Sequence, residues 1–383
     1  MSKTKTPQIP GVTAVVERAV REGRVPGALV EVRADGELAH RGAHGVLDDE
    51  TGHPLRHDTV LWLASLSKPV GTAALLQLAD EGRLGLDDPV SRYVPEFAAP
   101  GRVRVLRPGS PSPPALPFGP PPDPLPEFDV VPAERELTLF DLVTHTGGLQ
   151  GLLTWNPEFV PPAHGQALAE YVPSLGGLVR DFQPGSSWAY SNMASFDVLA
   201  RVVEVAAGDE LDKVLRSRLF EPLGMTTTGF GRAGEETAMP LIPPFRDDPV
   251  VQGTTFRSTS GGLWSTAEDY LRFAELLRAG GVHAGHRLLS EESIARMTTN
   301  RTGSLCPGLN GREPAPGIGF GLSVAVIDDP AAAGEFLPAG SFGWDGVSSR
   351  RFWVSPTGWS LFLYAPDPAV QREIEDAVTT ALA

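Results

Sequence analysis

The feature that most constrains the fold of this 383-residue chain is the placement of strand patterns at both ends, with helical patterns between them. Near the start, two β-prone runs flank Asp35-Gly36, a dipeptide typical of a tight hairpin turn. Near the other end, strands are predicted for residues 319–326, 350–354 and 359–364. The two ends are expected to share one sheet around an inserted helical segment, which predicts an α+β fold.

Helical periodicity places helices at residues 12–22, 65–81, 196–203 and 370–382, and another after a capping-box-like Thr266-x-x-Asp269. In the second of these helices Pro69 is tolerated only in the first turn, because its missing N–H has no partner to lose there. The helix is therefore expected to begin close to Ser65 and to end at Gly82.

Charge and cysteine content exclude several classes of function. The 32 basic and 47 acidic residues give a formal net charge of -15, which disfavours a nucleic-acid or anionic-membrane partner. The single cysteine, Cys306, rules out an internal disulfide framework and a cysteine-ligated metal site, and we expect no cofactor. No apolar h-region follows the basic start and no apolar run approaches the ~18 residues of a membrane span, so we predict a cytoplasmic protein.

Prolines are concentrated in one segment, Pro108 to Pro126, where ten of nineteen residues are proline. Proline removes backbone donors, so this segment is expected to be irregular or polyproline-like. It is either a tolerated surface insertion or a lid over a site, because long ordered loops often carry function.

The first candidate site begins at the expected helix start, with Ser65-Leu66-Ser67-Lys68. Residues three apart share a helix face, so Lys68 would lie beside the hydroxyl of Ser65. A lysine kept neutral by burial can take the serine proton, and the helix N-terminus favours a developing oxyanion. Ser67 is a competing hydroxyl, but it points to a different face. Taken alone, this tetrad is equally consistent with the capped start of a surface helix.

Two further segments carry suitable chemistry. Tyr190 and Asn192 lie in a turn-rich loop before a helix, where the phenol could exchange protons and the amide could bind a substrate carbonyl or Lys68. The alternatives are a half-buried core tyrosine and a helix cap. Trp344-Asp345-Gly346 precedes a β-rich stretch and is otherwise an ordinary edge strand. No complete G-x-S-x-G, H-E-x-x-H, G-x-G-x-x-G in a strand-to-helix context, or P-loop competes with these motifs.

Taken together and in this order, the three motifs resemble those of the serine β-lactamase/penicillin-binding-protein superfamily, class C-like, closest to the family VIII carboxylesterases and related acyltransferases. Flanking segments that support the resemblance are residues 62–70, 141–149, 184–192, 219–225, 260–265 and 351–356. The resemblance implies a five-stranded antiparallel sheet flanked by helices and a mainly helical domain, with the site between them. We expect residues 1–75 and 210–383 in the sheet domain and 76–209 in the helical domain.

The resemblance also implies roles for the motif residues. Ser65 is expected to be the acylated nucleophile, with Lys68 and Tyr190 as the general-base and proton-relay pair in an order that the sequence leaves open. Asn192, Trp344, Asp345 and Gly346 are expected to bind substrate. The backbone N–H groups of Ser65 and Val347 are expected to form the oxyanion hole.

The third motif departs from the superfamily pattern in two places. β-Lactamases and penicillin-binding proteins have a lysine where this chain has Trp344, and the esterase branch usually has Trp-Gly-Gly. Asp345 departs from both: it either repels anionic substrates and holds an acyl acceptor, or points away into solvent. His145 occupies a family position that we interpret as structural.

We therefore predict a serine hydrolase or acyltransferase acting through acyl-Ser65 on a small ester, amide or thioester, foremost a carboxylesterase. A transacylase using an alcohol or amine acceptor is the main alternative. A β-lactamase or DD-peptidase ranks below it, because the lysine of the third motif is missing, and so does a non-catalytic binding protein of this fold. Substrate identity and oligomeric state are not encoded in these motifs.

Overall fold

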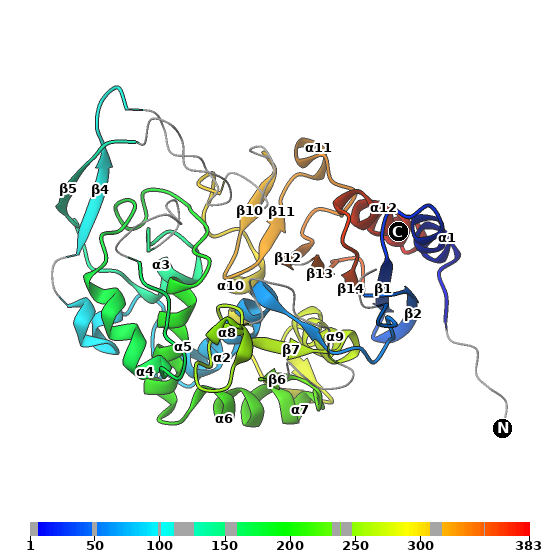
Figure 1. Cartoon of the computed structure of the whole chain (residues 1–383), viewed down its shortest axis with the longest axis horizontal. Helices are drawn as coiled ribbons and strands as arrows, with labels where there is room; N and C mark the ends of the chain where they lie inside the picture. The colour runs from blue at the N-terminus through cyan, green and yellow to red at the C-terminus, as the bar shows by residue number, and fades with distance from the viewer. Residues whose placement is uncertain are drawn as a thin grey trace.

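A seven-stranded antiparallel sheet forms the centre of the computed structural model, with strand order β10-β11-β12-β13-β14-β1-β2 (Figure 1). The structure describes residues 7–47, 52–98, 101–110, 126–149, 159–231, 238, 247–306, 316–347 and 349–383. The strands are β1 (Gly27–Ala34), β2 (Glu37–Gly45), β10 (Ile318–Phe320), β11 (Ala325–Ile327), β12 (Phe342–Gly346), β13 (Arg350–Val354) and β14 (Trp359–Tyr364).

The two ends of the chain share this sheet, as the sequence predicts. Strand β1 pairs antiparallel with β14, from Leu29 opposite Tyr364 to Ala34 opposite Trp359. The β1–β2 hairpin turns at Asp35 and Gly36, whose φ angles are 51° and 84°. Two successive positive φ values match the twist of a two-residue hairpin, which explains why Asp-Gly occupies this turn.

The sheet is larger than the family resemblance implied, with seven strands in place of five. One prediction was also wrong: residues 319–326 form the short strands β10 and β11, not a single strand. A tight turn separates them, in which the amide of Gly321 donates to the carbonyl of Val324 at 2.8 Å. Ser323 takes a positive φ of 65° in this turn, a backbone conformation that ends an extended strand.

Helices cover both faces of the sheet and fill the middle of the chain. They are α1 (Pro10–Arg21), α2 (Ser67–Asp80), α3 (Leu139–Val143), α4 (Leu168–Tyr171), α5 (Ala194–Ala207), α6 (Leu211–Leu215), α7 (Glu221–Leu223), α8 (Pro249–Gln252), α9 (Ala267–Arg278), α10 (Glu291–Thr298), α11 (Pro330–Ala333) and α12 (Pro368–Ala381). Helices α1 and α12 pack together on one side of the sheet, whereas α9 packs on β1, β13 and β14 from the other (Figure 1).

Helix α9 begins as expected, but its cap is simpler than a capping box. Thr266 accepts a hydrogen bond from the amide of Asp269 at 3.3 Å. The Asp269 carboxylate accepts from the amide of Thr227 at 2.7 Å and so fastens a neighbouring loop. Helix α5 ends at Ala207 and is followed by Gly208, whose φ of 73° is a left-handed conformation that glycine adopts without steric cost.

Three smaller sheets accompany the seven-stranded sheet in the described residues. Strands β3 (Leu61–Trp62), β7 (Leu263–Ser265) and β6 (Gly229–Phe230) form a three-stranded sheet, and β8 (Val282–His283) pairs with β9 (His286–Arg287). Strands β4 (Arg102–Leu106) and β5 (Phe128–Pro132) form a hairpin that brackets the proline-rich segment. Residues 111–125 of that segment lie outside the described residues, so its role as insertion or lid stays a prediction.

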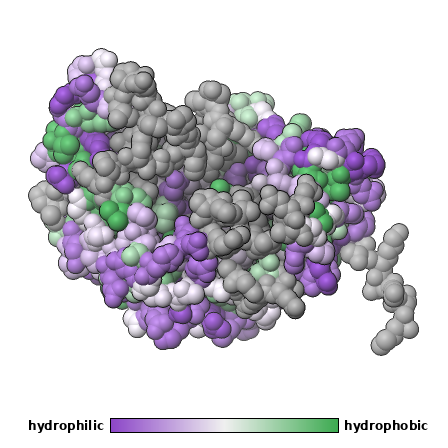
Figure 2. Space-filling model, viewed as in Figure 1, coloured by the Kyte–Doolittle hydropathy of each residue, from purple (hydrophilic) through white to green (hydrophobic). Residues whose placement is uncertain are grey.

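The surface of the described residues is mainly hydrophilic on the face shown in Figure 2, where apolar residues appear in separate small groups. Two of the exposed apolar residues, Val105 and Val130, lie on the β4–β5 hairpin. Within the described ranges, no helix is long and apolar enough to cross a membrane.

Candidate active site

Ser65 lies in a 3-10 turn (Ala64–Leu66) between β3 and α2. Helix α2 itself starts at Ser67, slightly later than predicted, and Pro69 falls in its first turn as expected. Ala64 has a φ of 49°, a left-handed conformation that costs energy for a residue with a Cβ and is often found at functional turns. The turn leaves the side chain of Ser65 partly exposed, while its neighbours Ala64 and Leu66 are buried.

Lys68 is fully buried directly behind this turn. Its Nζ lies 3.3 Å from Oγ of Ser65, and it donates to the backbone carbonyls of Asn192 at 2.8 Å and Ser260 at 2.5 Å. Burial disfavours the charged amine and lowers the pKa of Lys68 to about 7, an effect that the negative charge of Asp197 partly opposes. A large fraction of Lys68 is therefore neutral near pH 7, with its lone pair available to take a proton.

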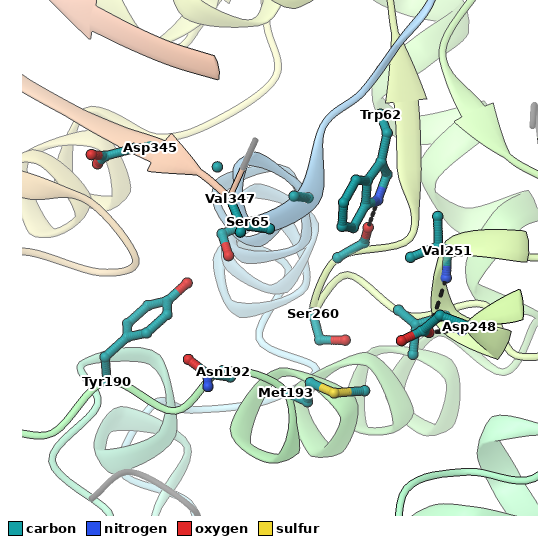
Figure 3. A pocket seen from close by; sticks show the side chains of 14 residues that line it. Trp62, Ser65, Tyr190, Asn192, Met193, Asp248, Val251, Ser260, Asp345 and Val347 are labelled. Atoms are coloured by element: carbon teal, nitrogen blue, oxygen red, sulfur yellow. Dashed lines mark hydrogen bonds between the residues drawn. The ribbon is translucent and has the colours of Figure 1, made fainter. Parts of the chain in front are cut away.

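Tyr190 lies in the loop before α5, and its hydroxyl points toward Ser65 (Figure 3). Its side chain is buried, and burial raises the pKa of the Tyr190 phenol, although hydrogen bonds with Ser65 and Trp344 oppose this rise. The indole Nε1 of Trp344 donates to the Tyr190 hydroxyl at 3.4 Å. The phenol is therefore held in its neutral form, ready to donate a proton.

Asn192 contributes differently from the sequence-based expectation. Its backbone carbonyl, and not its side-chain amide, accepts the hydrogen bond from Lys68. The side chain lines the cavity in front of Ser65, and its buried Oδ1 has no hydrogen-bond partner in the part of the chain that the structure describes. The amide thus remains available to a bound molecule.

Strand β12 runs beside the Ser65 turn because Gly346 has no side chain. A Cβ at this position would lie 2.6 Å from the carbonyl oxygen of Leu63, a contact that real Cβ atoms do not make. The close approach brings Val347 and Ser65 to the same wall of the cavity (Figure 3). This placement is what the expected oxyanion hole, formed by the backbone N–H groups of Ser65 and Val347, would require.

Asp345 forms an ion pair that the sequence did not predict. Its Oδ2 accepts from Arg351 on β13 at 3.0 Å, and Figure 3 shows its carboxylate directed away from Ser65. Arg351 also pairs with Glu375 of α12 at 2.9 Å. Burial lowers the pKa of Arg351, but Glu375 and Asp345 outweigh burial and raise it above the ordinary value. Asp345 is therefore paired with a permanent cation that it shares with Glu375, and neither sequence-based alternative included this pairing.

Sequence reasoning missed a buried carboxylate next to Lys68. Asp197 of α5 accepts from Oγ of Ser258 at 2.5 Å, and the backbone of Ser260 in the same loop accepts from Lys68. Burial raises the pKa of Asp197 to about 6, whereas hydrogen bonds from Ser258 and Ser260 act against it. The available signal was a charged residue directly after Phe196, on a helix whose residues are otherwise apolar at this point.

His145 supports the loop that carries Tyr190. Its Nδ1 accepts from the amide of Ser191 at 3.0 Å, and its ring centroid lies 4.6 Å from that of Tyr190. Burial and the nearby Lys68 hold the pKa of His145 well below its usual value, so the ring stays neutral. This geometry agrees with the structural role interpreted from the sequence.

These elements enclose a cavity of about 420 Å³ in front of Ser65 (Figure 3). Its described lining residues are Trp62, Ala64, Ser65, Tyr190, Asn192, Met193, Asp248, Val250, Val251, Ser260, Gly261, Asp345, Gly346 and Val347. Within the described ranges no group of His, Cys, Asp and Glu side chains is arranged to hold a metal ion. The arrangement suits nucleophilic attack on a carbonyl, with one amine and one phenol to move the protons.

Comparison with known proteins agrees with this chemistry. The family model described as Beta-lactamase matches residues 12–365. Esterase EstB of Burkholderia gladioli is 32% identical over 375 residues, which cover 89% of this chain and 86% of EstB. Lovastatin esterase of Penicillium rubens is 30% identical over 339 residues, covering 80% of each chain. Among solved structures, EstCE1, described as a hydrolase with promiscuous acyltransferase activity, superposes with a TM-score of 0.74 at 24% identity, covering 97% of this chain and 98% of EstCE1.

Proposed function

The chain belongs to the beta-lactamase family of serine hydrolases, and on that premise we propose that it is a carboxylesterase that forms an acyl intermediate on Ser65. The observation that carries the proposal is the buried Lys68 amine 3.3 Å from the Ser65 hydroxyl. A serine is a weak nucleophile until a neighbouring base removes its proton, and Lys68 is a base of suitable pKa at neutral pH.

In the proposed reaction, Oγ of Ser65 attacks the ester carbonyl carbon while its proton passes to neutral Lys68. We assign this first proton to Lys68 because burial makes Tyr190 difficult to ionise. The negative charge moves to the carbonyl oxygen, where the N–H groups of Ser65 and Val347 would hold it. The C–O bond to the leaving group then breaks, and Tyr190 donates its proton to the departing alkoxide and regains one from Lys68.

Deacylation repeats these steps with water as the nucleophile. Water loses a proton to the Lys68–Tyr190 pair, its oxygen bonds to the acyl carbon, and Ser65 leaves with that proton restored. An alcohol or amine that reaches the acyl-enzyme first would give acyl transfer in place of hydrolysis. The transacylase is therefore the second candidate, because the same intermediate serves both reactions.

The described wall of the cavity favours an ester over a β-lactam or a peptide carboxylate. Trp344 occupies the position of the third-motif lysine, and its side chain is buried against Tyr190. No lysine or arginine is present among the described residues that line the cavity. An anionic substrate would therefore find no counter-charge there, and two of the relatives at 30% identity or more are named as esterases.

Intact-mass and peptide mass spectrometry after exposure to a fluorophosphonate tests the proposal. We expect one adduct on Ser65 in the wild-type protein, none in Ser65→Ala, and an unchanged adduct in the control Ser67→Ala, whose buried hydroxyl accepts from the amide of Leu263. An unmodified Ser65 would contradict its assignment as the nucleophile and would favour a non-catalytic binding protein. Product analysis with p-nitrophenyl butyrate and added butanol or butylamine then separates hydrolysis from acyl transfer.

A further inference from the structure

One side of the cavity combines apolar walls with a single carboxylate. Met193, Val250 and Val251 line this side together with the aromatic ring of Trp62. Asp248 also faces the cavity here, on the side away from Tyr190 and Asp345 (Figure 3). A substrate group that fills this side is therefore mainly apolar and meets a carboxylate at one point.

Only one carboxylate oxygen of Asp248 forms hydrogen bonds with the backbone. Oδ1 caps α8 by accepting from the amides of Val250 at 2.8 Å and Val251 at 3.4 Å. Oδ2 has no hydrogen bond or ion pair with the described residues. The capping bonds fix the direction of the carboxylate, and they leave its second oxygen free to bind a ligand.

Asp248 is also the carboxylate in the described lining that has no ion pair. The other carboxylate there, Asp345, is paired with Arg351, and the described lining contains no lysine or arginine. The chain as a whole carries a net charge of -15, which adds a negative potential. The face of Trp62 likewise favours a cation over an anion.

The proton chemistry places the acyl group on this side of the cavity. Tyr190 must reach the oxygen of the leaving group to protonate it, so the leaving group lies on the Tyr190 side. The oxyanion is held between Ser65 and Val347, which leaves the side of Met193 and Asp248 for the acyl chain (Figure 3).

We propose that the acyl donor carries a positively charged nitrogen at the far end of a short aliphatic acyl chain, and that Asp248 determines this preference. The inference rests on the proposed function, because it assumes that Ser65 becomes acylated. Asp248 binds the distal charge and takes no part in the bond-making steps.

Three p-nitrophenyl esters of similar length and shape test the proposal: 4-(trimethylammonio)butyrate, its neutral isostere 5,5-dimethylhexanoate, and the anionic glutarate monoester. Because the leaving group is constant, differences in kcat/KM report the acyl group alone. Asp248→Asn removes the charge and keeps an N-cap acceptor, so α8 should remain intact. Asp247→Asn is the matched control, because it removes the same charge from the adjacent, exposed residue, which does not line the described cavity wall.

We expect the wild-type protein to prefer the cationic ester over its neutral isostere by about tenfold and to disfavour the anionic ester. This ratio should fall to near one in Asp248→Asn and stay unchanged in Asp247→Asn. An equal ratio in wild type and Asp248→Asn would overturn the proposal, provided that the neutral ester acylates Ser65. If none of the three esters acylates Ser65, the proposed function fails and this inference falls with it.

A second experiment places the positive charge on the alcohol part of the ester, which is the leaving group. Acetylcholine and its neutral isostere 3,3-dimethylbutyl acetate differ only in the leaving group. We expect little discrimination between them, because the leaving group lies on the Tyr190 side. Discrimination that appears only in this experiment, and that depends on Asp248, would overturn the assignment of Asp248 to the acyl side.

Discussion

The amine of Lys68 lies 3.3 Å from the hydroxyl oxygen of Ser65, three residues earlier in the chain. A 3-10 turn at Ser65 followed directly by α2 produces this contact, because residues three apart lie on the same side of such a turn. Burial of the amine then makes it a base at neutral pH. Position and basicity thus have separate physical origins, and each can be tested separately.

Replacing Lys68 with methionine should abolish turnover and change how stability depends on pH. The pKa of Lys68 is about 7 in the folded protein, whereas an unfolded lysine titrates at about 10.4. Between these values the unfolded chain binds more protons, so Lys68 makes the free energy of unfolding rise with pH, by at most about 1.4 kcal/mol per pH unit.

Urea denaturation at pH 7, 8 and 9 measures this effect. The wild-type protein should gain stability relative to Lys68→Met as the pH rises, while Lys213→Met, at an exposed lysine, should run parallel to the wild type. Parallel curves for Lys68→Met and wild type would show that the buried amine is already charged at neutral pH.

The Asp197→Asn variant should retain activity to lower pH than the wild type. Neutral Lys68 is the active form, so kcat/KM rises as the pH passes the pKa of Lys68. The negative charge of Asp197 raises that pKa, and its removal should shift the acid limb to lower pH by about half a unit. The pH profile of p-nitrophenyl butyrate hydrolysis measures the shift.

Asp209→Asn, just beyond the end of α5 and exposed, is the control for loss of one negative charge. Its profile should overlay that of the wild type. If the two variants shift the acid limb equally, the effect comes from net charge and not from the buried carboxylate.

The Gly346→Ala variant should lose both activity and stability. The added methyl would lie 2.6 Å from the carbonyl oxygen of Leu63, so β12 must move away from the Ser65 turn. Overpacking of this kind costs about 1–3 kcal/mol, and displacement of Val347 should lower kcat by about tenfold or more through the oxyanion hole. Thermal unfolding and steady-state kinetics measure the two effects.

Gly11→Ala in α1 is the control for the change of residue type, because its new methyl meets nothing closer than 3.7 Å. We expect wild-type kinetics and equal or higher stability for it. Wild-type kinetics in Gly346→Ala would mean that the distance between β12 and the Ser65 turn does not limit catalysis.

The Asp345→Asn variant should be destabilised and should not change which acyl acceptor is preferred. Its carboxylate accepts a hydrogen bond from Arg351, which keeps Glu375 as a second partner, so loss of the charge should cost about 1–3 kcal/mol. Urea denaturation measures the loss, and the product ratio for water, butanol and butylamine measures preference. A changed product ratio with unchanged stability would instead support acceptor binding by Asp345.

Much of the local structure could be predicted because it depends on short-range chemistry. The Asp35-Gly36 turn and the placement of Pro69 in a first helical turn each follow from the backbone preferences of single residues. The pattern of residues 319–326 led to a wrong prediction of one strand, because hydrophobic periodicity does not show where a chain reverses direction. Ser323 adopts a positive φ in the turn, a conformation that cannot be predicted from a serine.

The sequence alone determined that this is an α+β chain whose ends share a sheet, and that Ser65 and Lys68 lie on one side of a helical turn. Tertiary structure alone decided the partners: Lys68 donates to a carbonyl 192 residues away, and Asp345 pairs with Arg351 on the adjacent strand. Burial and strand register set these contacts, and both arise only when distant segments pack together. The same packing lowers the pKa of Lys68 and so makes an ordinary lysine a base.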